Sequence, residues 1–186
     1  MGSIASNLQE VKRRIGAACA GAGRDANSVT LLAVSKTFDA QAVREALASG
    51  QRAFGENYVQ EALAKIEALA ALRPQIEWHF IGPLQSNKTR PVAETFDWVH
   101  SVDRLKIAQR LAEQRPAGLP PLMLCLQVNV SGEASKSGVL PAELPALARA
   151  VAALAPERVQ LRGLMSIPEA ATDLEAQHHP HLKYLT

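Results

Sequence analysis

Short apolar runs alternate along the chain with longer segments in which apolar residues recur every three or four positions. The short runs are typical of buried strands and the longer segments of amphipathic helices. Strands are predicted at 31–36, 52–55, 76–81, 98–101, 122–130 and 161–165. Helices are predicted after the caps Ser6, Asp39 and Asp103, from Val59 to Pro74, and from about Pro141 to Leu154. Strands that alternate with helices through short connections predict a parallel sheet.

The ends of the predicted strands favour one α/β architecture. The apolar runs end in Gly, Ser, Asn or charged residues, as in a (β/α)8 barrel of the TIM type, whose site lies at the carboxyl ends of its strands. About six βα units are present. An open doubly wound sheet is the alternative, but the chain has no Gly-x-Gly-x-x-Gly and no Walker loop, which argues against its nucleotide-binding versions.

The first predicted strand, Leu-Leu-Ala-Val-Ser-Lys at 31–36, ends in a lysine. A lysine held at a strand end against apolar walls loses hydration, so its free amine becomes available to attack a carbonyl. We therefore interpret Lys36 as a Schiff-base lysine. The alternative is a strand-end lysine whose ammonium group reaches water.

Other polar residues at strand ends are candidates for the same site. They are Glu56, Asn57, His79, Gln85, Ser101, Asn129 and Ser166. An amine among mostly neutral polar groups suits imine chemistry with an aldehyde cofactor. Glu56 and Asn57 could instead cap a helix, His79 could be a core histidine, and Met165 could fill the core. Lys88 and Lys136 lie in polar surroundings and are expected to be solvated.

Composition narrows the function classes. Twenty basic and eighteen acidic residues are dispersed, which argues against nucleic-acid binding. The two cysteines make neither a disulfide framework nor a Cys-x-x-Cys motif, and Cys125 is expected to be a small buried hydrophobe. No segment is long and apolar enough to span a bilayer, and residues 1–9 lack the pattern of a signal peptide. A cytoplasmic protein without membrane partners is expected.

Five motifs follow one another at a recognisable spacing. They are Leu-Leu-Ala-Val-Ser-Lys (31–36), Phe-Gly-Glu-Asn-Tyr-Val-Gln-Glu (54–61), Trp-His-Phe-Ile-Gly-Pro-Leu-Gln-Ser-Asn-Lys (78–88), Ser-Val-Asp-Arg-Leu (101–105) and Gly-Leu-Met-Ser-Ile-Pro (163–168). With them the chain resembles the pyridoxal phosphate homeostasis proteins, which are related to the N-terminal domain of alanine racemase. The resemblance covers residues from about 5 to 177.

The resemblance implies a (β/α)8 barrel that holds pyridoxal 5′-phosphate (PLP) as a Schiff base on Lys36, without established catalytic turnover. Asn57, His79, Met165 and Ser166 match family positions that line the cofactor site, so the resemblance implies that they bind PLP. It also implies PLP-requiring apoenzymes as partners. The alternatives are a racemase-like PLP enzyme and a damaged product with impaired PLP binding.

The resemblance fades at Gln177, so we expect an incomplete barrel domain at 1–177 and a divergent tail at 178–186. The last two strands, which carry the phosphate site in such barrels, are expected to be missing through truncation or a frame shift. Six strands would leave two sheet edges unpaired. We therefore expect weak PLP retention and association between chains, where the full-length family is expected to be monomeric. A histidine metal site in the tail is a distant alternative.

Overall fold

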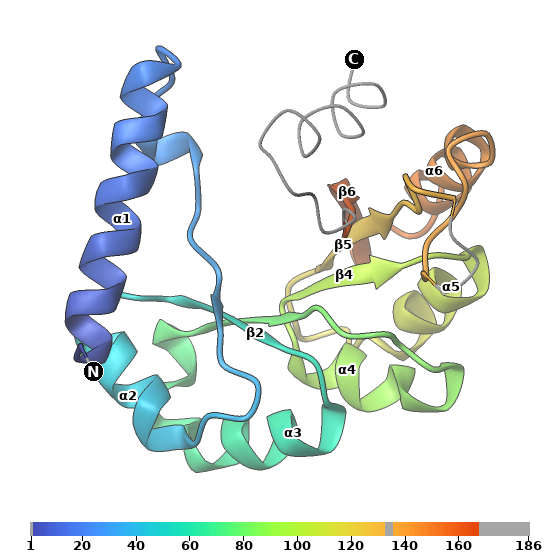
Figure 1. The fold of residues 1–186 in the computed structure, drawn as a ribbon. Helices are drawn as coiled ribbons and strands as arrows, with labels where there is room; N and C mark the ends of the chain where they lie inside the picture. Colours follow the sequence, from blue (N-terminus) through green and yellow to red (C-terminus); the bar gives the residue numbers. More distant parts are fainter. Residues whose placement is uncertain (1, 133–135, 168–186) are drawn as a thin grey trace. The chain divides into compact units, whose positions relative to one another are not determined.

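The computed structural model describes residues 2–132 and 136–167, and they fall into two compact units, 1–79 and 80–186 (Figure 1). The first unit contains α1 (Ile4–Gly21), η1 (Ala26–Ser28), β1 (Ala33–Val34), α2 (Ala40–Ala48), β2 (Ala53–Glu56), α3 (Val59–Ala68), η2 (Ala70–Gln75) and all but the last residue of β3 (Glu77–Phe80). The second contains η3 (Ser86–Lys88), α4 (Thr89–Thr95), β4 (Trp98–Val102), α5 (Leu105–Gln114), β5 (Leu122–Gln127), α6 (Leu144–Ala152) and β6 (Val159–Met165). Six strands thus alternate with helices, which confirms the predicted α/β class.

The first unit has a core of aromatic and aliphatic side chains between its strands and helices. In β1 and β2, Ala33 pairs with Phe54 and Val34 with Gly55, in parallel. The Phe54 and Trp78 rings lie 5.8 Å apart, and both side chains are almost fully buried. From α2, Val43 joins this core. Ala46 and Leu47 of the same helix are buried as well.

The second unit is built on three parallel strands. β5 pairs with β4 on one side and with β6 on the other, with Leu122 opposite Val159 and Gln127 opposite Met165. Leu122, Leu124 and Leu126 are fully buried, as is Leu111 of α5. The Phe80 and Phe96 rings meet edge to face at 5.4 Å. Cys125 is a buried free cysteine, as predicted.

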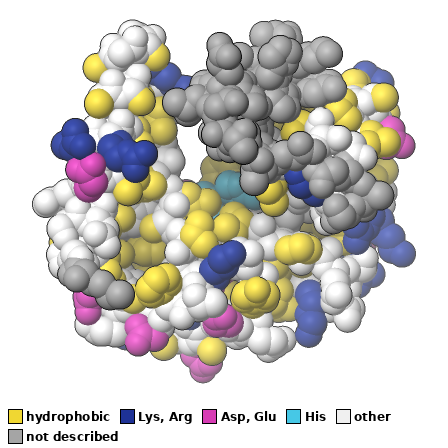
Figure 2. Space-filling model, viewed as in Figure 1, with side chains coloured by type: hydrophobic (Ala, Val, Ile, Leu, Met, Phe, Trp, Pro, Cys, Tyr) yellow, Lys and Arg dark blue, Asp and Glu magenta, His cyan; other side chains and the backbone are white. Residues whose placement is uncertain are grey.

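The first predicted strand was wrong in length and burial. Only Ala33–Val34 is strand, although Ser35 adds one ladder bond to Gly55, and Val34 is 47% exposed. β1 is paired with β2 alone among the strands of its unit, so one edge of β1 stays open. Val11, Val34 and Phe38 line an apolar groove of about 280 Å³ beside α1 and α2. Figure 2 shows exposed hydrophobic side chains next to charged ones on this part of the surface.

Several predicted helix boundaries were also wrong. Ser3, not Ser6, caps α1, because the Ser3 hydroxyl accepts from the Ser6 backbone N–H. Asp103 does not cap α5; its carboxylate instead pairs with the Arg104 guanidinium at 2.7 Å. The helix expected from Pro141 begins only at Leu144. The sequence pattern missed α4, whose seven residues are too few for a clear helical period and include a proline in the first turn.

None of the helices in the described part of the chain has the length and apolar character that a membrane crossing requires. The predicted tail at 178–186 and its histidines lie outside the described residues.

Candidate functional site

Lys36 lies in a tight turn at the carboxyl end of β1. The Ser35 N–H donates to the Gly55 carbonyl at 2.9 Å, and the Phe38 N–H donates to the Ser35 carbonyl at 3.1 Å. Lys36 is therefore the second residue of a four-residue turn, and Thr37 is the third with a φ of 67°. A positive φ at the third position is typical of a type II turn, where glycine is preferred. Here a β-branched residue adopts it, at a cost in backbone strain.

The strand register separates the residues at this end of β1 and β2 into two faces. Because Val34 pairs with Gly55, the next pair is Ser35 with Glu56, and the Ser35 hydroxyl donates to the Glu56 carboxylate at 2.6 Å. If the alternation continued one residue further, the side chains of Lys36 and Asn57 would both be directed to the opposite face. Phe54 and Glu56 share a face by the same rule. The prediction that Glu56 shares a site with Lys36 is wrong, because Glu56 lies on the helix-covered face.

Asn57 has an unused acceptor. Its Oδ1 is buried and has no hydrogen-bond partner among the described residues. It does not cap α3, whose N-cap is Tyr58 without a side-chain cap bond. A buried acceptor without a donor costs free energy unless a ligand supplies one. Asn57 therefore fits a ligand that presents an N–H or O–H group at the carboxyl end of β2.

His79 belongs to the same face of the first unit. Trp78 contacts Phe54 on the helix-covered face, so alternation along β3 directs His79 to the face of Lys36 and Asn57. The side chain is 7% exposed, and Nε2 lies 2.8 Å from a Glu77 carboxylate oxygen. This pairing fixes the ring, as a structural core histidine requires, and it leaves the predicted PLP contact of His79 a prediction.

The other two predicted PLP-binding residues belong to the second unit. Met165 is the last residue of β6, opposite Gln127, and Ser166 follows directly; both side chains are half-buried. They occupy the strand-end positions that the sequence pattern predicted. Their contribution to a site with Lys36 stays a prediction.

The remaining strand-end candidates have separate surroundings. Gln85 is exposed. Asn129 organises its own loop, because its Oδ1 accepts from the Gly132 N–H at 3.0 Å. Ser101 is buried, and its hydroxyl has no hydrogen-bond partner among the described residues. Lys88 and Lys136 are half-buried rather than fully solvated.

The sequence pattern missed a buried lysine beneath the Lys36 turn. Lys65 of α3 is 4% exposed at its side chain, and its Nζ lies 2.6 Å from Glu56 Oε1 and 3.3 Å from Glu61 Oε1. Two features could have revealed it. Lys65 falls on the apolar stripe of α3, beside Ile66, and it stands four residues after an acid, the spacing of a helical ion pair.

No group of three or more metal-ligating side chains occurs among residues 2–132 and 136–167.

Comparison with known proteins places the chain in a family. The model of the alanine racemase N-terminal domain matches residues 1–185. The pyridoxal phosphate homeostasis protein of Pseudomonas aeruginosa is 65% identical over 178 residues, which are 96% of this chain and 76% of that protein. The protein of the same name from Escherichia coli K12 is 55% identical over 178 residues, which are 95% of this chain and 75% of that protein. The chain thus spans about three quarters of the length of either relative.

Solved structures agree with this relationship. PipY of Synechococcus elongatus, solved with PLP bound, superposes with a TM-score of 0.75 at 42% identity, over 94% of this chain and 75% of PipY. Alanine racemase of Corynebacterium glutamicum shares the fold, with a TM-score of 0.67 at 17% identity over 98% of this chain and 48% of the racemase. The chain belongs to the pyridoxal phosphate homeostasis protein family, whose fold is that of the alanine racemase N-terminal domain.

Proposed function

We propose that this chain binds PLP covalently through Lys36 and serves intracellular PLP homeostasis without catalytic turnover. The observation that carries the proposal is the position of Lys36 directly after β1 and of Asn57 directly after its partner strand β2, with the Asn57 Oδ1 buried and without a partner among the described residues. Further support comes from the P. aeruginosa relative, named for PLP homeostasis, and from PipY, solved with PLP bound.

The chemistry requires one nucleophilic amine. When bound, PLP would supply an aldehyde that a lysine amine can hold covalently. Lys36 would hold the cofactor through its amine, and Asn57 would offer it a hydrogen-bond acceptor. His79, Met165 and Ser166 complete the proposed binding set.

The absence of turnover is part of the proposal. Exchange of an amino-acid α-proton needs a group that accepts and returns the proton. His79 lies 2.8 Å from Glu77, a pairing that orients its ring, so the absence of turnover is a matter for direct measurement. A cytoplasmic location, and apoenzymes that require PLP as recipients, belong to the same proposal.

Borohydride trapping tests PLP binding. The purified chain is incubated with PLP, reduced with borohydride, and mapped by peptide mass spectrometry. We expect stoichiometric labelling at Lys36, its loss in Lys36→Ala, and unchanged labelling in the matched control Lys88→Ala. Scattered labelling, or none, in the unsubstituted chain would overturn the proposal.

Proton exchange tests the absence of turnover. The PLP-treated chain is incubated with L-alanine in deuterated water, and deuterium at the α-carbon is followed by NMR. We expect no exchange above that of free PLP. Exchange that disappears in Lys36→Ala would favour the racemase-like alternative.

A further inference from the structure

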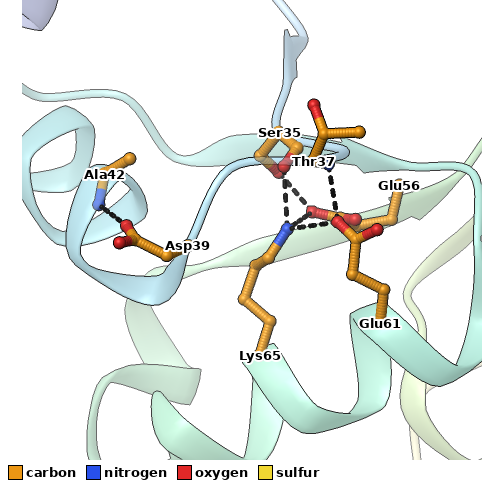
Figure 3. Close-up of polar contacts among 7 residues, drawn as sticks. All are labelled: Ser35, Thr37, Asp39, Ala42, Glu56, Glu61 and Lys65. Carbon is orange, nitrogen blue, oxygen red and sulfur yellow. Dashed lines mark hydrogen bonds and ion pairs between the residues drawn. The ribbon is translucent and has the colours of Figure 1, made fainter.

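Two charged residues of α3 form hydrogen bonds to the turn that carries Lys36 (Figure 3). The Lys65 ammonium donates to the Ser35 carbonyl at 2.7 Å. The Glu61 carboxylate accepts from the Thr37 N–H at 2.6 Å. These contacts hold the backbone immediately before and immediately after Lys36.

Glu61 and Lys65 also pair with each other, and Lys65 pairs with Glu56 of β2. Lys65 Nζ lies 3.3 Å from Glu61 Oε1 and 2.6 Å from Glu56 Oε1, and the same Glu56 oxygen accepts from the Ser35 hydroxyl. Figure 3 shows these groups converging between α3 and the end of β1. We call Glu61 and Lys65 of α3, together with Glu56 of β2, the α3 anchor. It bonds to the backbone or side chain of Ser35 and Thr37, the two neighbours of Lys36.

The buried charges of the α3 anchor are an inefficient source of stability compared with apolar side chains. Burying an ion pair removes hydration from both charges, and apolar residues of similar size often stabilise a fold equally well. Glu56 Oε2 is buried without a partner among the described residues, which adds to the desolvation penalty. Thr37 holds a left-handed conformation that a β-branched residue disfavours, and Glu61 supports it directly. The polar groups therefore serve the geometry of the turn.

We infer that Glu61 and Lys65 are positioning residues for Lys36: they fix the backbone on both sides of it so that its amine is presented on the face opposite the anchor. This inference rests on the proposed function, because it concerns the reactivity of Lys36 toward an aldehyde. A poorly held nucleophile samples unproductive directions, and misplacement by about 1 Å can lower a rate by about 100-fold.

Four variants test the inference. Glu61→Ala removes the acceptor of the Thr37 N–H at a partly exposed position, and Glu61→Gln keeps an acceptor oxygen without the charge. Lys65→Met removes the donor to Ser35. Ile66→Ala is the matched control, because it weakens packing of the same helix without touching the turn. For each variant, the rate of borohydride-trapped PLP labelling at Lys36 and the thermal midpoint are measured together.

We expect Glu61→Ala and Lys65→Met to slow labelling of Lys36 by about tenfold or more. Glu61→Gln should stay within about twofold of the unsubstituted chain if the acceptor oxygen is what matters. Ile66→Ala should lower the thermal midpoint without slowing the labelling. Should Lys65→Met fail to fold, Glu61→Ala and Glu61→Gln decide the matter.

The outcomes separate this inference from the function on which it rests. Labelling of Lys36 at an unchanged rate in Glu61→Ala would overturn the positioning role and leave PLP binding intact. Slowing that follows the thermal midpoint equally in Ile66→Ala would also overturn it, because stability alone would then explain the effect. Failure of the unsubstituted chain to label at Lys36 would instead overturn the proposed function.

Discussion

The ammonium of Lys65 donates a hydrogen bond to the carbonyl of Ser35 at 2.7 Å, one residue before Lys36. Two lysines 29 positions apart in the sequence are thereby linked through a single backbone group. Lys65, which is buried, holds the backbone at the point where Lys36 follows the end of β1. The placement of Lys36 therefore depends on a side chain of α3.

The Lys65–Glu56 pair should respond asymmetrically to substitution. Lys65→Met leaves the Glu56 carboxylate buried without its cation, which should destabilise the chain by about 3–5 kcal/mol. The double variant Lys65→Met/Glu56→Met removes both charges and should recover much of that loss. Urea denaturation of the two variants measures the difference. Equal stabilities of the single and double variants would contradict a buried charge pair.

The aspartates that precede α2 and α5 should contribute differently to the free energy of unfolding. The Asp39 carboxylate accepts from the Ala42 N–H at 2.9 Å, so Asp39→Ala should cost about 1 kcal/mol of stability. Asp103→Ala is the matched control, because Asp103 makes no cap bond to α5, and it should cost clearly less. Urea midpoints give both values. A larger effect at Asp103 would show that the capping assignment is wrong.

Gly138 should tolerate no side chain. Its φ is 129°, and an added Cβ would lie 2.6 Å from the Asn129 nitrogen. The backbone conformation alone should make Gly138→Ala cost about 1–3 kcal/mol, and the contact with rigid backbone adds to this. Gly118→Ala serves as the control, since its Cβ would meet nothing within 4 Å. Thermal unfolding compares the two, and similar midpoints would contradict the close approach of residues 129 and 138.

The thiol of Cys125 should be protected from alkylation in the folded chain. Burial raises the pKa of this thiol to about 11, and the nearby Arg162 charge lowers it less. At pH 8.5 the folded chain should hold about 100-fold less thiolate at this position than the unfolded chain. Iodoacetamide labelling with and without urea, mapped by mass spectrometry, measures the ratio. Rapid labelling of Cys125 without urea would contradict its burial.

The same thiol makes stability depend on alkaline pH. Its folded-state pKa lies above the ordinary value of 9.0, so between about pH 9 and 11 the folded chain retains a proton that the unfolded chain has lost. The stabilising contribution is therefore complete below about pH 9 and is lost as the pH rises through 11. Cys125→Ala should show a weaker decline of the urea midpoint across this range.

The sequence pattern predicted the strands better than it predicted the helices and helix caps between them. Apolar runs located each of the six strands in the described part of the chain, because buried parallel strands are rich in apolar side chains. It missed α4, which is too short to show a period, and it misassigned Asp103, whose carboxylate pairs with Arg104 instead of capping. Local competition of this kind between capping and ion pairing depends on side-chain geometry that spacing does not encode.

At the site, the grouping of Lys36 with Asn57 stays a prediction, whereas the face expected for Glu56 was wrong. The two-residue period of β2 puts Glu56 on the side of Phe54, so this error was avoidable from the sequence. Lys65 was harder to find. A helical lysine is exposed in most proteins, and only the carbonyl of Ser35 and the carboxylates around it explain why this one is buried.

The turn after β1 carries one lysine and is bonded by a second, and the two differ in their access to reagents. An aldehyde in solution can approach the half-buried Lys36, whereas three oxygens surround Lys65 Nζ and its side chain is 4% exposed. Chemically identical groups are thus distinguished by burial and by ion pairing. Lys65, which holds the turn, is shielded from the aldehyde that Lys36 is proposed to bind. The residue that positions the reactive lysine is therefore itself protected from modification.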